Sequence, residues 1–347
     1  MGSKTQRIWS PSGNLSRDNP PASAQVDTAC TSDLEVQNSC HALSAEKINL
    51  FSYKNDSRIA QWNVRTLSEP SRLAQACKVM EDYKIDVLGV AESRWTDQGE
   101  FTSQTGELFL YSGGQTRLHG VGLILSRKAK QALLEFNPVS DRIITIRLNC
   151  KFRKITLIQC YAPTEAAEGE DKDEFYEALT SVVSNSRAGD IMIIMGDFNA
   201  KVGNDNTNVS HLMGRHGLAG PRNNNGERLV EFCGNNNLFI GGTKFPHADI
   251  HKYTWESPDG TTRNQIDHIL ISRKYHNTLL DVRTRRGADI YSDHILLTAK
   301  LRLRPAGIRK LDHAAQIFDV EKFKCPNFKE QYHQRLQDGI GHLAERY

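Results

Sequence analysis

The chain has 347 residues, of which 38% are hydrophobic and 24% charged, and its formal net charge is +3. This length allows one large domain or two smaller ones with a sizeable core. The longest uninterrupted apolar run, residues 191–195, is too short to cross a membrane, and the N-terminal sequence lacks a signal-peptide pattern. These features predict a soluble protein without a membrane partner. So small a net charge does not by itself indicate binding to nucleic acid.

Seven cysteines are scattered along the chain, and no two of them form a CxxC pair. An odd number of widely spaced cysteines is typical of free, mostly buried thiols in a reducing compartment. The pattern argues against a disulfide framework or a zinc site and predicts an intracellular protein. Two basic stretches, residues 283–287 and 300–310, slightly favour a polyanionic partner, although such clusters are usually solvated faces.

The expected elements begin after an N-terminal segment of low regularity. Residues 1–57 are rich in Ser, Asn, Pro, Ala and Asp without helical or strand periodicity, which predicts disorder. A strand is expected at 58–64, then a helix at 68–83 with Ser68 as its N-cap. The later elements are expected, in chain order, as strands at 85–90, 108–114, 121–126, 142–148 and 154–163, a helix at 171–186, a strand at 190–195, a helix at 226–237, and strands near 238–242, 252–255, 266–272 and 294–303.

Many strands interleaved with a few helices predict an α/β protein with a large sheet-based core and helices outside it. This pattern does not distinguish one folded sheet from two packed sheets. The strand pattern ends near residue 304, and a polar helical stretch from about residue 320 to 346 closes the chain. We therefore predict a disordered segment at 1–57, a folded domain at 58–304 and a helical tail at 305–347.

Polar side chains recur at the ends of the expected strands. They are Asn63, Glu92, Tyr161, Asp197, Asn199, Asp267, Asp293 and His294. Each alone has an ordinary explanation, such as a turn residue, a strand-end cap, a hydrogen-bonded tyrosine or a core histidine. Their joint occurrence predicts that they converge at one edge of the sheet.

The chemistry of this set is that of a divalent cation beside a phosphate. Carboxylate and amide oxygens without sulfur suit Mg²⁺ or Mn²⁺, with Glu92 as the best ligand and Asp293 and Asn63 behind it. An Asp that fixes the tautomer of a His would let that His contact a phosphate. Asp197, oriented by Asn199, could take the proton of an attacking water.

The ordered motifs WNVR, AESRW, CYAPT, MGDFNA, YTW, NQIDHIL and SDH resemble the endonuclease/exonuclease/phosphatase superfamily over about residues 58–304. The stretches GDFNAKVG, GRHGLAGPRNNNGERLVEFC and YTWESPDG are similar to the apurinic-like endonuclease domain of non-LTR retrotransposons. Residues 318–337 resemble the segment that links such a domain to a reverse transcriptase; the 347 residues contain no polymerase sequence, so we expect a free-standing or truncated endonuclease. The resemblance implies a four-layer α/β sandwich, DNase I-like, of two packed mixed sheets flanked by helices.

The resemblance also implies roles for individual residues. Glu92 would be the principal metal ligand, with Asn63 and Asp293 nearby. Asp197 would be the base with Asn199 as its partner, while Tyr161 and His294, the latter oriented by Asp267, would contact the phosphate. Further candidates for touching substrate or DNA are Arg94, Thr164, Asn225 and Trp255, although a core or wedge role is the ordinary explanation of the tryptophan. Thr164 stands where repair-type apurinic endonucleases commonly have Asn, which favours the retrotransposon branch.

Three functions of different classes follow. The leading one is a Mg²⁺-dependent phosphodiesterase that nicks DNA and leaves a 3′-hydroxyl, with Mn²⁺ as an alternative metal. The second keeps the site and changes the substrate to inositol phosphates, a lipid or RNA. The third is a non-catalytic remnant of a mobile element that serves as a binding protein. A DNA substrate implies a nuclear protein, and we also expect the protein to be monomeric.

Overall fold

The structure, a computed structural model, describes residues 50–51, 55–150, 153–303 and 324–344. Nearly all of the predicted disordered segment at 1–57 lies outside these ranges. α5 (Pro326–Ala344) forms within the predicted helical tail, whose residues 305–323 and 345–347 are also outside them. The three-segment division therefore stays a prediction. In the part of the chain that is described, no helix is both long enough and apolar enough to span a membrane.

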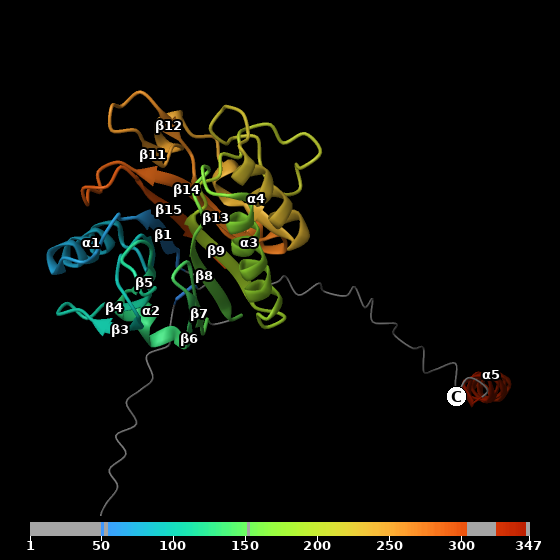
Figure 1. The fold of residues 1–347 in the computed structure, drawn as a ribbon. Helices are drawn as coiled ribbons and strands as arrows, with labels where there is room; N and C mark the ends of the chain where they lie inside the picture. Colours follow the sequence, from blue (N-terminus) through green and yellow to red (C-terminus); the bar gives the residue numbers. More distant parts are fainter. Residues whose placement is uncertain (1–49, 52–54, 151–152, 304–323, 345–347) are drawn as a thin grey trace, which may run out of the picture. The chain divides into compact units, whose positions relative to one another are not determined.

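One mixed sheet contains seven strands (Figure 1). At its centre β1 runs parallel to β2 and antiparallel to β15. Its strands, in spatial order, are β14 (Leu279–Arg285), β15 (Leu296–Leu301), β1 (Ser57–Asn63), β2 (Val87–Ala91), β5 (Val121–Leu125), β4 (Leu108–Ser112) and β3 (Gln98–Thr102).

The second mixed sheet contains six strands and faces the first. β8 and β9 run parallel at its centre, and β13 pairs antiparallel with β9. Its strands, in spatial order, are β10 (Leu238–Ile240), β13 (Asp267–Ser272), β9 (Ile191–Asp197), β8 (Ile155–Tyr161), β7 (Ile143–Leu148) and β6 (Leu133–Ser140). A separate hairpin joins β11 (Trp255–Glu256) to β12 (Arg263–Asn264).

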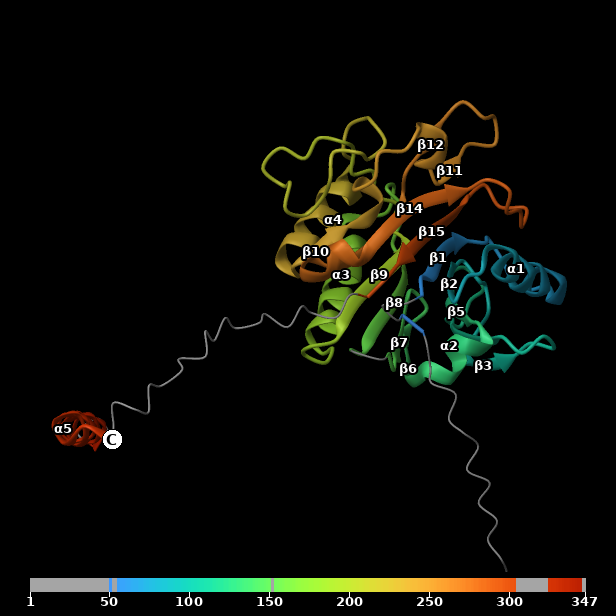
Figure 2. The same cartoon turned by 180° about the vertical axis from the view of Figure 1, so that it is seen from behind.

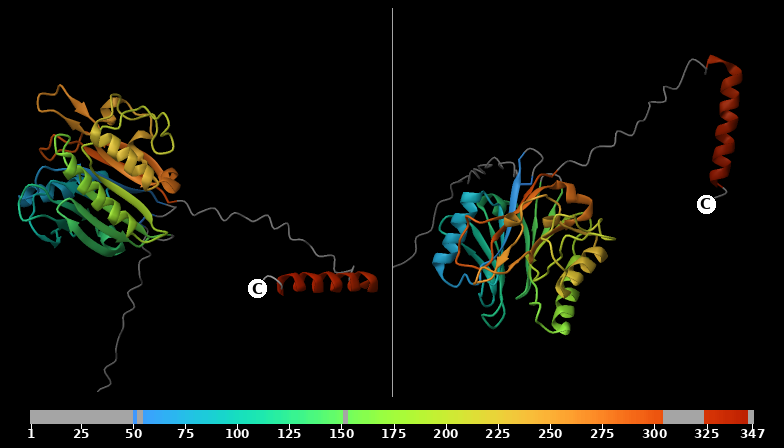
Figure 3. Two further views of the ribbon diagram at one scale, coloured as in Figure 1. Left: turned by 45° about the vertical axis from the view of Figure 1, so that its right-hand side comes forward. Right: turned by 90° about the horizontal axis from the view of Figure 1, so that it is seen from above.

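Helices cover the outer faces of both sheets, as Figures 2 and 3 show. α1 (Pro70–Tyr83) packs Leu73 and Met80 into a cluster with β1 and β2. α3 (Gly169–Ser184) and α4 (Asn224–Asn235) bury their apolar faces against the six-stranded sheet. A third apolar cluster fills the space between the sheets. The inner strands β1, β2, β5, β8 and β9 are buried on two faces, which is why they consist mostly of apolar residues. The predicted α/β sandwich of two packed sheets is confirmed.

Two details differ from the sequence prediction. Ser68 is not the N-cap of α1, because the helix begins at Pro70 after Glu69, and the Ser68 hydroxyl pairs with Thr66 Oγ1 at 2.8 Å. Proline is well suited to the first helical position, since its missing N–H has no partner there. The sequence analysis also missed α2 (Arg127–Ala132), β3, β6, β12 and β14, which are short, exposed or rich in charged residues.

Candidate active site

The strand ends of the two sheets bring the predicted polar residues together at one edge. In the six-stranded sheet, Asp197 pairs in register with Tyr161 on one side and with Asp267 on the other. Residues paired in register point to the same face of a sheet, so these three side chains form a row. From the other sheet, Asn63 Nδ2 donates to Asp197 Oδ2 at 3.0 Å. The site therefore spans the seam between the sheets.

Glu92 lies at the centre of one half of the site. Its Oε1 accepts hydrogen bonds from Asn63 Nδ2 at 2.8 Å and from the Tyr161 hydroxyl at 3.0 Å. Burial, followed by the negative charges of Glu92 and Asp197, raises the pKa of Tyr161 well above its ordinary value. The phenol therefore stays protonated and is a hydrogen-bond donor at neutral pH.

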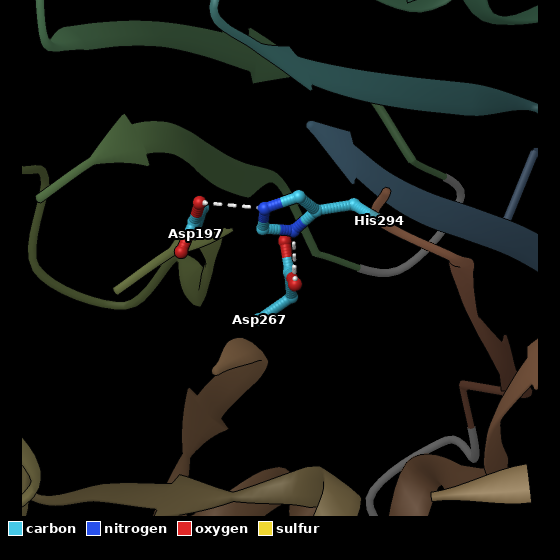
Figure 4. A group of neighbouring side chains, drawn as sticks. All are labelled: Asp197, Asp267 and His294. Carbon is cyan, nitrogen blue, oxygen red and sulfur yellow. Dashed lines mark hydrogen bonds and ion pairs between the residues drawn. The ribbon is translucent and has the colours of Figure 1, made fainter. Parts of the chain in front are cut away.

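His294 and two carboxylates form the other half, shown in Figure 4. Its Nδ1 lies 2.9 Å from Asp267 Oδ2, and its Nε2 lies 3.7 Å from Asp197 Oδ2. Burial opposes the charged imidazolium, but the carboxylates of Asp267 and Asp197 outweigh it and raise the pKa of His294 to about 9. The ring is therefore a cationic donor facing Asp197 at neutral pH.

Asp197 is almost fully buried, and its other oxygen is held by the chain that follows it. Asn199 donates its backbone N–H to Asp197 Oδ1 at 3.0 Å and its side-chain amide to the Ala162 carbonyl at 3.1 Å. Burial and the neighbouring Asp267 charge raise the pKa of Asp197 to about 7, against the opposing effect of His294. Such a pKa suits a group that takes up a proton near neutral pH.

Several non-glycine residues at the site have backbone angles in the left-handed region. The φ angles are 52° at Glu92, 57° at Arg94 and 50° at Asn199. This conformation is unfavourable for residues with a Cβ and is retained where the surroundings fix it, which happens often at functional sites. The turn after β2 therefore directs Glu92 into the site and leaves the Arg94 side chain partly exposed beside it.

Asp293 and Trp255 connect the site to the β11–β12 hairpin. Trp255 Nε1 donates to Asp293 Oδ2 at 2.9 Å, and the Trp255 backbone forms an isolated bridge with His294. Arg65 Nε lies 3.8 Å from Asp293 Oδ1. The structure thus places Trp255 as a support for Asp293 at the partly exposed base of this hairpin.

The two remaining candidates are placed differently from each other. Asn225 is 1% exposed, and its Nδ2 donates to the carbonyls of Pro163 at 3.0 Å and Asn199 at 3.3 Å. It therefore ties the loops after β8 and β9 together. Thr164 is exposed on the loop after β8. Contact of either residue with substrate stays a prediction.

Sequence reasoning missed residues that hold this site in place. Gln61 Nε2 donates to Asp267 Oδ1 at 3.3 Å, and the Thr254 hydroxyl accepts the backbone N–H of Asp267 at 3.0 Å. The Ser292 hydroxyl donates to the Asn63 carbonyl at 2.6 Å. A signal for Gln61 was present in the sequence, because an amide between Ala60 and Trp62 in a strand expected to be buried needs a polar partner.

The donor set suits a hard divalent cation. Glu92 and Asp293 offer carboxylate oxygens, and their side chains are 18% and 25% exposed, recessed but reachable. Asn63 directs its Nδ2 at Glu92, and its Oδ1 accepts the Arg65 N–H at 3.0 Å. The second oxygen of Glu92 lies 3.4 Å from Arg94 Nη2. Separately, Asp197, Asp267 and His294 offer potential ligand atoms within 4.8 Å of one another. The edge where the two sheets meet thus contains a candidate acidic metal site. The assignment of particular residues as metal ligands stays a prediction.

Comparison with known families agrees with this geometry. The sequence model of the Endonuclease/Exonuclease/phosphatase family matches residues 60–294. The chain belongs to this family, whose members are typically hydrolytic nucleases and phosphatases, and its nucleases depend on divalent metals.

Two curated relatives are proteins named Craniofacial development protein 2. The one from Bos taurus is 38% identical over 280 residues, which cover 80% of this chain and 46% of the relative. The one from Tragulus javanicus is 38% identical over 262 residues, which cover 75% and 45%. The chain therefore spans about half the length of the curated relatives it matches.

Solved structures share the fold at low sequence identity. The endonuclease domain of TRAS1, a telomere-specific non-LTR retrotransposon, aligns with 72% of this chain and 100% of its own, with 15% identity and a TM-score of 0.51. The Neisseria 3′ phosphatase NExo bound to product DNA hairpin covers 71% and 100%, with 21% identity and a TM-score of 0.55. An AP endonuclease from Archaeoglobus fulgidus covers 71% and 100%, with 17% identity and a TM-score of 0.53.

Proposed function

We propose that the chain is a Mg²⁺-dependent DNA endonuclease that hydrolyses one phosphodiester bond of a duplex and leaves a 3′-hydroxyl. The DNA-processing proteins among its structural relatives support a DNA substrate. DNA as a substrate also favours nuclear residence, and we further propose that the chain acts as a monomer. The observation that carries the proposal is Asp197, a buried carboxylate positioned between Asn63 and His294 at the seam of the sheets.

Glu92, Asn63 and Asp293 would hold the cation. When bound there, Mg²⁺ supplies positive charge that offsets the negative charge developing on the phosphate and leaving oxygens. Mn²⁺ satisfies the same oxygen ligands.

The side chains around the cation divide the remaining tasks of hydrolysis. Asp197 accepts a proton from the attacking water while the water oxygen bonds to phosphorus. Asn199 keeps the carboxylate of Asp197 oriented through the hydrogen bond from its backbone N–H to Asp197 Oδ1. The bond between phosphorus and the 3′-oxygen breaks, and that oxygen takes up a proton to become the 3′-hydroxyl. The opposite product carries a 5′-phosphate.

His294 donates a hydrogen bond from Nε2 toward the phosphate, and its cationic imidazole is fixed by Asp267. A donor held in place before the reaction stabilises charge that develops in the transition state without further reorganisation. The single hydroxyl proton of Tyr161 is donated to Glu92 in the free protein and would turn to the phosphate when the substrate binds.

The substrate class is tested with supercoiled plasmid in Mg²⁺ or EDTA. We expect conversion to nicked circles in Mg²⁺ alone, and we expect DNA ligase to reseal the nicks, because ligase needs a 3′-hydroxyl next to a 5′-phosphate. Inositol phosphates and single-stranded RNA are offered in parallel. Intact plasmid together with hydrolysis of either alternative substrate would overturn the DNA assignment and keep the phosphodiesterase or phosphatase chemistry. Inactivity on every substrate would favour a non-catalytic remnant.

A further inference from the structure

A second His–Asp pair lies beside Tyr161, whose ring centroid is 6.0 Å from that of His119. His119 Nδ1 is 2.9 Å from Asp141 Oδ2, the same separation as between His294 and Asp267. Both side chains of this second pair are about one-third exposed, at 29% and 32%. His119 lies near the end of the loop between β4 and β5, and Asp141 lies in the short turn between β6 and β7. None of the roles assigned above uses this pair.

The neighbouring Arg142 fixes the hydrogen-bond pattern of His119. Arg142 Nη2 lies 3.0 Å from His119 Nε2. A guanidinium has donors and no acceptor, so Nε2 must accept this bond. The proton of the neutral imidazole then sits on Nδ1 and is donated to Asp141. The three side chains therefore form a directed series from Arg142 through His119 to Asp141.

Arg142 also holds Tyr161 by three contacts. Its Nη1 donates to the Tyr161 carbonyl at 3.1 Å, and its Cζ lies 5.2 Å from the centroid of the phenol ring. The Tyr161 backbone N–H donates in turn to the Arg142 carbonyl at 2.9 Å. A cation over the face of an aromatic ring attracts it and limits its tilt. The hydroxyl of that ring donates to Glu92.

The backbone of the same segment supports the turn that carries Glu92. Arg94 N–H donates to the His119 carbonyl and Ser93 N–H to the Gly120 carbonyl, both at 2.9 Å. Gly120 N–H reaches the Asp141 carbonyl at 3.0 Å. Gly120 has a φ of 102°, and a Cβ there would lie 2.6 Å from Ser93 Oγ, so this close contact requires glycine. His119 is thus held at a fixed distance from the Glu92 turn.

We propose that His119, oriented by Asp141, positions Arg142 against Tyr161 and thereby fixes the phenol that faces Glu92. This inference rests on the proposed function, because it assigns His119, Asp141 and Arg142 as positioning residues for a donor in phosphodiester hydrolysis. They act through Tyr161 and do not contact the DNA.

Two amide substitutions separate the contacts of His119. In His119→Gln the amide oxygen reaches the position of Nε2 and still accepts from Arg142. In His119→Asn the amide reaches the position of Nδ1 and keeps only Asp141. We expect kcat of His119→Asn to fall about tenfold, as in His119→Leu, because a displaced catalytic group loses much of its effect. His119→Gln should stay close to wild type, and KM should change little in all three.

A double-mutant comparison tests the route through Tyr161. In a Tyr161→Phe background the phenol hydroxyl is already absent, so adding His119→Asn should lower kcat no further. Equal kcat for the Gln and Asn variants would overturn the proposal, as would full additivity with Tyr161→Phe. A raised KM with a smaller salt dependence of DNA binding would also overturn it, because it would indicate direct contact with phosphate.

A readout that does not need activity keeps this test separate from the proposed function. With ring-¹³C tyrosine, the Tyr161 signal is identified as the one missing from the NMR spectrum of Tyr161→Phe. Both substitutions remove the imidazole, whose ring centroid lies 6.0 Å from that of Tyr161, so both shift the signal through the lost ring current. We expect the signal to broaden or split in His119→Asn and to stay a single sharp signal in His119→Gln. Signals of equal width in the two variants would overturn the positioning role even if the wild-type protein cleaves no DNA.

Discussion

At the scale of single residues, the properties of the site arise from burial and from what each group is bonded to. Asp197 and His294 are both almost fully buried, but burial raises the pKa of the carboxyl and opposes charge on the imidazole. For His294 the charge of the Asp267 carboxylate, followed by that of Asp197, outweighs burial and raises the pKa. A buried group without these partners would be neutral, so the side chains function as one set.

The raised pKa of His294 makes stability depend on pH. Its pKa rises from 6.5 to about 9 on folding, so its stabilising contribution is complete below 6.5 and is lost as the pH rises through about 9. We expect the melting temperature of the wild type in EDTA to fall more steeply than that of His294→Gln between about pH 6.5 and 9. Each 1 kcal/mol corresponds to about 2–4 °C in a domain of this size. Parallel melting curves for the two proteins would contradict a charged native imidazole.

At the scale of elements, α4 connects stability to the site. Its N-cap, Asn223, accepts the Gly226 N–H at 2.8 Å and the Lys201 N–H at 2.8 Å. Asn223 Nδ2 donates to the Asn199 carbonyl at 3.1 Å. The cap of this helix therefore also fixes the loop that orients Asp197.

Removing this cap should affect both properties. We expect Asn223→Ala to lower the free energy of unfolding by about 1–2 kcal/mol through the lost cap, and to lower kcat because the Asn199 loop is released. Ser126→Ala is the matched control: Ser126 caps α2 by accepting the Ala129 N–H at 3.2 Å, and no active-site residue is bonded to its side chain in the described structure. Chemical denaturation and nicking assays should show a stability loss in both variants and an activity loss in Asn223→Ala alone. Equal nicking activities in Asn223→Ala and Ser126→Ala would contradict a role of the Asn223 cap in supporting the active site.

The sequence predicted most of the elements and the residues that meet at the site, for reasons that are physical. Strands buried on two faces leave continuous apolar runs, and polar residues directly after them, such as Glu92 and Asp197, mark one edge of the sheet. The exposed edge strand β3 leaves no such pattern. Contacts between residues far apart in the sequence, such as Asn225 to Pro163 or Gln61 to Asp267, depend on tertiary packing, so no local periodicity identifies the partners.

At the scale of the whole molecule, the two sheets meet so that neither could form the site alone. Asn63 and Glu92 come from the seven-stranded sheet, and Tyr161, Asp197 and Asp267 from the other. The net charge of +3 is small for a partner as negative as DNA. Binding should therefore depend on a few local cations more than on the overall charge.

Arg94 offers a test of that local contribution. Its side chain is 44% exposed beside Glu92. In an Asp197→Asn background that prevents cleavage, we expect Arg94→Gln to reduce the slope of log affinity against log salt by about 1, because one phosphate contact is lost. Arg117 is also exposed, on the loop before His119, and the slope measured for Arg117→Gln serves as the comparison. An unchanged slope in Arg94→Gln would remove Arg94 from the DNA interface.

The measurement that bears most directly on the whole account is single-turnover cleavage of an end-labelled duplex by the wild type and by Asp197→Asn. We expect strand breakage that requires Mg²⁺, and a rate at least about 10²-fold lower in the variant, with DNA affinity preserved. Cleavage by Asp197→Asn at the wild-type rate, or wild-type cleavage that continues in EDTA, would contradict a metal-dependent site built around this carboxylate.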